Sequence, residues 1–131
     1  MLVADTNIIM RLVVDDDPVQ THRVKALLHK LEQSRGQLAL TQLVVAECVW
    51  VLESMKRPRQ VIAELLEAVL SMDVFKVEEK ERMERALQRY AEHRVDFVDA
   101  YLAGASEESG HTGVLSFDKD IGKLGVHWVR P

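Results

Sequence analysis

Four carboxylates stand in this sequence at positions that suit chemistry: Asp5, Glu47, Asp99 and Asp118. Asp5 and Asp118 each follow a short apolar run typical of a buried β-strand. Glu47 is the only charged residue of an otherwise apolar helical segment, and Asp99 borders the apolar side of a later helix. In open α/β sheets the ligand crevice lies outside the carboxyl ends of the strands. These positions therefore favour a common site.

The same residues also have ordinary structural explanations. Asp5 belongs to Asp-Thr-Asn, which is a typical turn and N-cap sequence. A buried carboxylate such as Glu47 is costly unless it is compensated, so it needs a salt bridge or an escape at the helix edge. Asp96 is a good N-cap, and Asp99 three residues later would complete a variant of the capping box. We favour a functional role because the acids recur at strand ends and helix starts.

Convergence of these four acids would itself imply a metal ion. Carboxylates within a few ångströms of one another cannot all stay ionised unless a cation lies among them. Ligation by oxygen alone suits Mg²⁺ or Mn²⁺. Zinc is disfavoured, because the five histidines show no paired spacing and Cys48 is the only cysteine.

The elements that must position the acids alternate between strands and helices. Strands are expected at residues 2–4, 38–40, 74–77, 113–116 and 126–129, and helices at 8–13, 18 to about 34, 43–52, 58–70, 78–94 and 97–105. Asp17 and Thr41 are the expected N-caps of the second and third helices. This alternation predicts an α/β fold with one central, mostly parallel sheet of four to five short strands, covered by helices on both faces. The strand at 2–4 is apolar on both faces and is expected in the middle of the sheet.

Length and composition set further bounds. A chain of 131 residues with 47% hydrophobic residues is expected to form one domain, residues 1–131, with a core that needs no disulfide. The formal net charge of −4 argues against binding nucleic acid by broad phosphate neutralisation, although metal ions held by clustered acids would reverse that local charge. No apolar run is long enough to span a membrane and no basic leader is present, so a cytoplasmic protein is expected.

One row of basic residues is expected to be structural. The helix at 78–94 carries arginines on one face, and neighbouring acids can neutralise them. The arginines are Arg82, Arg85 and Arg89, and the expected partners are Glu78, Glu81 and Glu92.

In order and spacing, these motifs resemble the PIN-domain ribonucleases, and among them the VapC-type toxins of toxin-antitoxin modules. The resemblance rests on the strand-end acid Asp5, on Glu47 in its apolar helix, and on the segments Asp96–Ala100 and Ser116–Asp120. It covers essentially the whole chain. Each motif alone is weak, and the set is fairly specific.

The resemblance implies roles for individual residues. The acids that match Asp5, Glu47, Asp99 and Asp118 form a pocket for one or two Mg²⁺ or Mn²⁺ ions and hydrolyse RNA phosphodiester bonds in that family. Asp5 and Asp99 would be the main metal ligands, while Glu47 and Asp118 would hold a second ion or its waters. The mechanism would be an in-line attack by a metal-activated water.

Other residues match supporting positions of the same motifs. Asp96 and Asp120 are further candidate ligands. Thr6, Asn7 and Ser116 match polar positions that orient the ligands. Ser116 stands where threonine is more usual, which keeps the hydroxyl.

The resemblance also implies a biological setting. The chain would be the toxin of a type II toxin-antitoxin pair that inhibits translation by cutting tRNA or rRNA. Its partners would be the RNA substrate and a cognate VapB-like antitoxin, with no membrane association. A homodimer is expected, and the apolar helix face from Val61 to Leu70 is a candidate interface.

Three other classes of protein fit less well. A haloacid-dehalogenase-type phosphatase needs a second aspartate where Asn7 stands. A receiver-like signalling domain needs paired acids after its first strand and an isolated late lysine, whereas Asp5 is unpaired and Lys119 lies between two acids. A catalytically silent PIN scaffold that only binds protein or RNA remains an alternative, although every expected acid is present.

Overall fold

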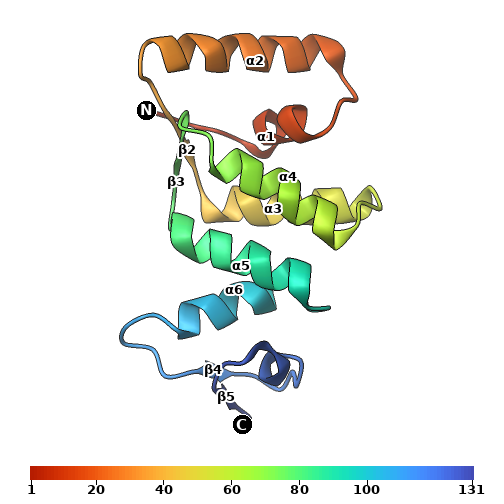
Figure 1. The fold of residues 1–131 in the computed structure, drawn as a ribbon, viewed down its shortest axis with the longest axis vertical. Coiled ribbons are helices and arrows are strands. Elements are labelled where there is room, and N and C mark those ends of the chain that lie inside the picture. Colours follow the sequence, from red (N-terminus) through yellow and green to blue (C-terminus); the bar gives the residue numbers. More distant parts are fainter. The chain divides into compact units, whose positions relative to one another are not determined.

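Parallel strands joined by helices make up the chain in the computed structural model, which describes residues 1–131 (Figure 1). The chain divides into two units, Met1–Glu79 and Lys80–Pro131. The first unit contains β1 (Leu2–Val3), α1 (Thr6–Val13), α2 (Pro18–Gln33), β2 (Leu38–Leu40), α3 (Gln42–Ser54), α4 (Arg59–Leu70) and β3 (Phe75–Val77). The second contains α5 (Lys80–Glu92), α6 (Phe97–Ser106), β4 (Val114–Leu115), the 3-10 helix η1 (Ile121–Leu124) and β5 (Trp128–Val129).

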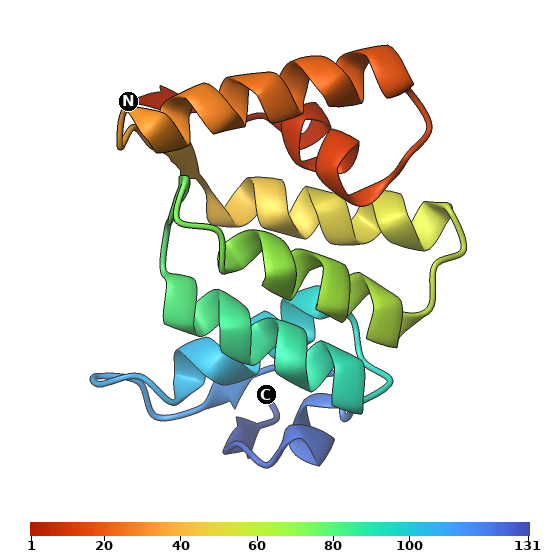
Figure 2. The ribbon, with the colours of Figure 1, turned by 45° about the horizontal axis from the view of Figure 1, so that its top comes forward.

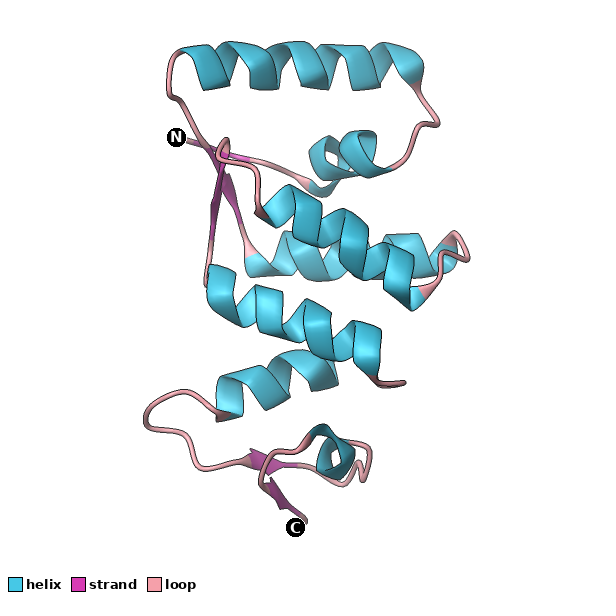
Figure 3. Ribbon diagram, in the orientation of Figure 1, coloured by secondary structure: helices cyan, strands magenta, loops and turns pink.

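All five strands are short and pair in parallel (Figure 3). The first unit has a three-stranded sheet in the order β1-β2-β3, and the second unit pairs β4 with β5. The α/β class, the five strands and their parallel direction are as the sequence predicts. The strands are divided between two sheets, whereas the sequence pattern suggested one.

The position of β1 differs from the expectation. It lies at the edge of its sheet, and β2 takes the middle. Leu2 and Val3 are 74% and 65% exposed, whereas Leu38 and Leu40 of β2 are buried. An apolar run predicts a strand, but it does not predict on how many sides that strand is covered.

Helix starts follow the capping residues in the sequence. The Asp17 carboxylate accepts a hydrogen bond from the backbone N–H of Gln20 at 3.0 Å, and Pro18 occupies the first helical position of α2. The Thr41 hydroxyl accepts from the N–H of Val44 at 3.3 Å and so caps α3. These predicted starts are confirmed.

Helices α3 and α4 lie side by side (Figure 2) and supply many of the buried side chains of the first unit. The buried side chains are Val45, Cys48, Val49 and Leu52 from α3 and Ile62, Ala63, Leu66, Val69 and Leu70 from α4. Most of the apolar face expected to supply a dimer interface is therefore used inside the unit. Val61 alone among its large residues is clearly exposed, at 37%.

Helix α3 is buried on one side only, contrary to the expectation from its apolar sequence. Glu47 is exposed, as are Leu43 and Trp50. The predicted desolvation of Glu47 is therefore wrong, and the carboxylate needs no compensating partner in this structure. Leucine and tryptophan are often found at protein surfaces, so their presence in a helix does not establish burial.

In the second unit, α5 packs against α6 through its predicted apolar stripe. Met83, Ala86, Leu87 and Tyr90 are all buried. The buried residues of helix α6 are mainly small: Ala100, Ala103 and Gly104, together with Phe97. Helical spacing predicts an apolar face of Phe97, Val98, Tyr101, Leu102 and Ala105. This prediction is correct for Phe97 and wrong for Val98 and Leu102, which are exposed.

The arginine row is paired, but its partners lie at the end of α6. Arg82 donates to both carboxylate oxygens of Glu108, at 2.5 and 2.7 Å, and Arg89 pairs with Glu107 at 2.6 Å. Arg82 also donates to the Tyr101 hydroxyl at 2.8 Å. The expected partners along α5 are therefore wrong, since contacts between the two helices replace contacts along one.

No helix of the chain has the length and apolar character needed to cross a membrane.

Candidate active site

Asp5 follows β1 and caps α1. Its Oδ1 accepts a hydrogen bond from the backbone N–H of Asn7 at 2.6 Å. The side chain is exposed, and its second oxygen has no hydrogen-bond partner. The capping explanation of Asp5 is therefore correct, and it leaves half of the carboxylate available to a ligand.

The negative charges of Glu47 and Asp5 both affect the pKa of one buried thiol, that of Cys48. Cys48 is fully buried, and burial is the main reason that the pKa of its thiol is raised to about 12. The negative charges of Glu47 and then of Asp5 contribute to the same increase. Since α1 also packs on α3, the first unit brings these two acids into one neighbourhood.

Asp99 lies among acids in the second unit. Burial is the largest cause of its raised pKa, followed by the negative charge of Asp118 and then by those of Asp96 and Asp120. Its side chain is half-buried, while Asp118 is exposed. The second unit therefore concentrates negative charge around the start of α6 and the loop after β4.

Hydrogen bonds fix the loop that carries Asp118. The Ser116 hydroxyl accepts from the backbone N–H of Asp118 at 2.9 Å, and Asp118 Oδ1 accepts from the N–H of Asp120 at 2.9 Å. Trp128 of β5 donates its indole N–H to the carbonyl of Ser116 at 2.8 Å. Asp120 forms an ion pair with Lys123 at 3.0 Å. Asp118 is thus held in place without forming an ion pair to a basic side chain.

Asp96 occupies the N-cap position of α6 without capping it. Its backbone is extended, as an N-cap requires, but its side chain makes no cap hydrogen bond. The capping role expected for Asp96 is therefore wrong. Its visible effect is electrostatic, through the pKa of Asp99.

The chemistry of these acids fits a divalent cation. None of Asp5, Glu47, Asp99 and Asp118 forms an ion pair with a basic side chain. All their donor atoms are oxygens, and the raised pKa of Asp99 marks negative charge that a cation would offset. Within either unit, no three acidic, histidine or cysteine side chains are arranged to hold an ion together. Each unit supplies acids of suitable chemistry, and neither contains a complete ligand set.

A pocket that the sequence did not indicate borders Asp5. It has a volume of about 290 Å³, and Asn7, Arg11, Gln20 and Arg23 contribute its polar lining. Of these four residues, only Asn7 was identified from the sequence, as part of the Asp-Thr-Asn motif. Arg23 and Gln20 come from α2, whose position against α1 cannot be read from periodicity.

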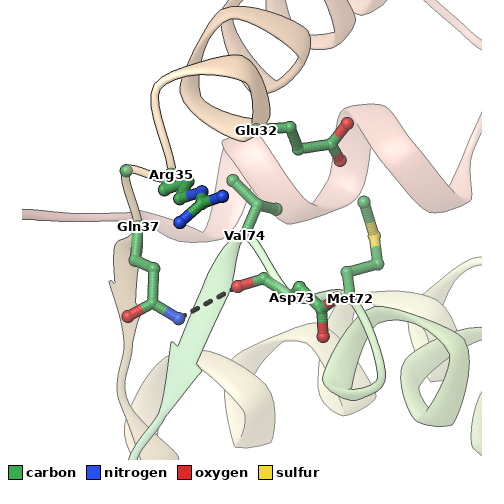
Figure 4. Close-up of a pocket in the computed structure, with 7 residues that line it drawn as sticks. Glu32, Arg35, Gln37, Met72, Asp73 and Val74 are labelled. Carbon is green, nitrogen blue, oxygen red and sulfur yellow. Dashed lines mark hydrogen bonds between the residues drawn. The ribbon is translucent and has the colours of Figure 1, made fainter.

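A larger cavity of about 550 Å³ lies elsewhere in the first unit (Figure 4). Glu32, Arg35, Gln37 and Asp73 line it, and Gln37 Nε2 donates to the carbonyl of Asp73 at 3.0 Å. These residues precede β2 and β3, whereas Asp5 follows β1. The larger cavity is therefore at the amino ends of its strands and includes none of the candidate acids.

Comparison with known protein families agrees with this arrangement of elements. A model of the PIN domain matches residues 2–126. The chain belongs to the PIN domain family. The matched residues include most of both units and all four candidate site acids.

One relative is similar along the whole PIN domain chain. The VapC ribonuclease of Aquifex aeolicus (strain VF5) is 27% identical over 133 residues, which cover 100% of this chain and 97% of that protein. No solved structure gives a significant match.

Proposed function

We propose that this PIN domain protein is a metal-dependent endoribonuclease that hydrolyses RNA phosphodiester bonds with the help of Mg²⁺ or Mn²⁺. The observation that carries the proposal is the acid cluster around Asp99, whose pKa is raised by burial and by neighbouring carboxylates. Such perturbed acids are commoner at functional sites than elsewhere. The similarity to a VapC ribonuclease supports the same reaction.

In this proposal Asp5 and Asp99 are the main metal ligands, and Glu47 and Asp118 hold a second ion or its waters. An ion held by these residues would supply the Lewis acidity that activates a water and stabilises the leaving oxygen of the phosphodiester. The chain's own contribution is orientation. The N–H of Asn7 fixes one oxygen of Asp5, and the Ser116 hydroxyl fixes the backbone that carries Asp118.

Three further candidates have smaller roles. Asp120 is already paired with Lys123, which makes it a weaker ligand. Asp96 adds negative charge near Asp99 and is available at the surface. Thr6 lies in the first turn of α1 beside Asp5, where it helps to shape the turn.

The proposed setting is a type II toxin-antitoxin pair. The chain would be the toxin, would cut tRNA or rRNA and so inhibit translation, and would bind a VapB-like antitoxin. This part rests on the resemblance of the motifs and on the name of the relative. A homodimer belongs to the same proposal, although little of the α4 face is left to form it.

Asp5 allows a decisive test because its two roles can be separated. Asn is as good an N-cap as Asp, so Asp5→Asn keeps the cap and removes the charge. Asp17→Asn is the matched control, since Asp17 caps α2 in the same way and belongs to no site. Cleavage of structured RNA with Mn²⁺ or Mg²⁺ should be lost in Asp5→Asn and retained in Asp17→Asn. A catalytically silent scaffold, the second candidate, would give no metal-dependent cleavage even for the wild-type protein.

A further inference from the structure

The pocket beside Asp5 has the donors of an anion site. Arg11, Gln20, Arg23 and Asn7 carry guanidinium or amide groups, and Asp5 is the only acid in the lining. Guanidinium groups bind phosphate oxygens with two parallel hydrogen bonds, which makes arginine the preferred partner of such anions. The pocket therefore gathers two guanidinium groups and two amide groups beside a single lining carboxylate, in a chain of net charge −4.

Arg11 builds one wall of the pocket. Its side chain is only 15% exposed, and Nη1 pairs with Asp16 at 2.8 Å, while Nε is buried without a hydrogen-bond partner. The carbonyl of Arg11 also accepts a hydrogen bond from the Thr21 hydroxyl at 3.2 Å. These contacts tie the end of α1 to the start of α2, so the wall is formed before any ligand arrives.

Arg23 supplies the charge that remains unmatched. It is exposed and forms no ion pair, whereas the charge of Arg11 is offset by Asp16. Gln20 is also exposed and lies three residues earlier on α2, so the two side chains share one face of that helix. A guanidinium and a carboxamide on one face, next to a pocket, can both donate to the same anion.

The size and lining of the pocket indicate which anion it takes. No aromatic side chain lines it, so it offers no surface on which a base could stack. A volume of about 290 Å³ is at the small end of ligand sites and suits a phosphate with part of its sugar. Contacts of this kind position a nucleic acid strand without reading its sequence.

We propose that this pocket binds a backbone phosphate of the RNA strand close to the bond that is cut, with Arg23 and Gln20 as the main donors and Arg11 as a fixed wall. The inference deepens the proposed ribonuclease function and rests on it for the identity of the strand. Arg23 and Gln20 act as positioning residues, because they hold the strand and leave the chemistry to the acids. A cation on Asp5 would reduce the repulsion between that carboxylate and the phosphate.

RNA binding in EDTA tests the pocket separately from cleavage. A fluorescent single-stranded oligoribonucleotide is titrated with wild-type protein, Arg23→Ala, Arg23→Lys and Lys25→Ala at several salt concentrations. Lys25→Ala is the matched control, since it removes one positive charge from the same helix two residues away and outside the pocket. We expect Arg23→Ala to weaken binding roughly 10- to 150-fold, as for a hydrogen bond to a charged group. The plot of log K against log salt has a negative slope, and the size of this slope should decrease by about 0.7 in Arg23→Ala. This is the value for the loss of one phosphate contact on a single strand. Arg23→Lys should keep the slope and lose part of the affinity.

The outcomes separate the pocket from the proposed activity. Weaker binding by Arg23→Ala alone supports the pocket even if the wild-type protein cuts no RNA, in which case the ribonuclease proposal fails. Equal binding and cleavage by wild type and Arg23→Ala, equal losses in Arg23→Ala and Lys25→Ala, or no RNA binding by wild type would overturn the pocket proposal. The proposal would also be overturned if Arg23→Ala bound RNA normally but no longer bound an antitoxin. The pocket would then bind an acidic side chain of that protein and not a phosphate.

Discussion

Asp99 is the carboxylic acid in which burial and neighbouring charge act most clearly against ionisation. Its carboxyl group is half-buried, and the negative charges of Asp118, Asp96 and Asp120 raise its pKa further. Such a group prefers to keep its proton in the folded chain. The folded state therefore holds a proton on Asp99 at pH values where the unfolded chain has released it.

The first prediction concerns Asp99→Asn. In EDTA the variant should be more stable than wild type at pH 7, because the substitution removes a disfavoured charge. The native pKa is raised, so wild-type stability decreases as pH rises from about 3.8 through that pKa and is constant above it. The difference in melting temperature should therefore vanish near pH 3.8 and grow as pH rises. Melting curves across this range, in the metal-free protein, check it.

The same variant should lose metal-dependent RNA cleavage by at least roughly 100-fold, beyond the 10- to 100-fold typical of groups that merely support a ligand. Asp17→Asn serves as the control, because it removes one aspartate charge at a helix cap that lies outside the proposed site. If Asp99→Asn cuts RNA normally, Asp99 is not a ligand.

The second prediction concerns the Cys48 thiol. A thiol with a pKa of about 12 is almost entirely protonated at pH 8, and only the thiolate is nucleophilic. The native protein should therefore react with a thiol reagent more slowly than the urea-unfolded chain by several orders of magnitude. Absorbance from a disulfide reagent measures both rates, and a native rate close to the unfolded rate would contradict this environment for Cys48.

At the scale of elements, close backbone approach decides which glycines can change. Gly113 precedes β4 with φ +151°, and a Cβ there would lie 2.6 Å from the carbonyl oxygen of His127. That oxygen accepts the β4–β5 hydrogen bond from the N–H of Val114. Gly104 in α6 differs, since its Cβ would meet neighbouring atoms only at 3.8 Å or more.

The third prediction compares these two glycines. Gly113→Ala should destabilise the second unit by about 1–3 kcal/mol, because strain and a clash with backbone act together. Gly104→Ala should be neutral or stabilise by up to about 1 kcal/mol, since alanine favours helix. Urea unfolding of both variants measures the difference. Equal effects of the two substitutions would mean that the β4–β5 contact does not limit the first.

The sequence predicted the elements better than their surroundings. Strand and helix positions, the caps Asp17 and Thr41, and the parallel direction followed from local pattern and chemistry. The exposure of Glu47, the edge position of β1 and the apolar face of α6 did not, because each depends on packing partners far away in the sequence. The acids were identified from their types and order, while the pocket formed by Arg11 and Arg23 arises only when α2 packs on α1.

For the whole molecule, binding of a metal ion should stabilise the fold, and this gives a fourth prediction. Mn²⁺ should raise the melting temperature of the wild-type protein, and at a concentration 100-fold above Kd the gain in stability should be about 2.7 kcal/mol. Asp5→Asn and Asp99→Asn should each abolish most of this increase. Asp17→Asn should respond as wild type does. An equal shift in all four proteins would count against the metal site.

The fifth prediction concerns a protein partner. An unneutralised group of carboxylates is a natural receptor for an arginine side chain, which binds them through two hydrogen bonds. We expect the protein to copurify with a small arginine-bearing antitoxin when it is isolated from its host at native expression. A matched preparation of Asp99→Asn should retain less of this partner. Isolation of the wild-type protein without any small partner would contradict the toxin-antitoxin assignment.

The division of the chain at Glu79 also matters while the protein is being made. Domains generally fold in order as the ribosome releases them. Asp5 and Glu47 emerge with the first unit, whereas Asp99 and Asp118 are translated only after that unit is complete. A nascent or prematurely terminated chain that stops before Asp99 therefore carries only two of the four proposed acids. If these acids do cut RNA, synthesis itself delays the activity, and the translation machinery is not exposed to an active nuclease by unfinished copies.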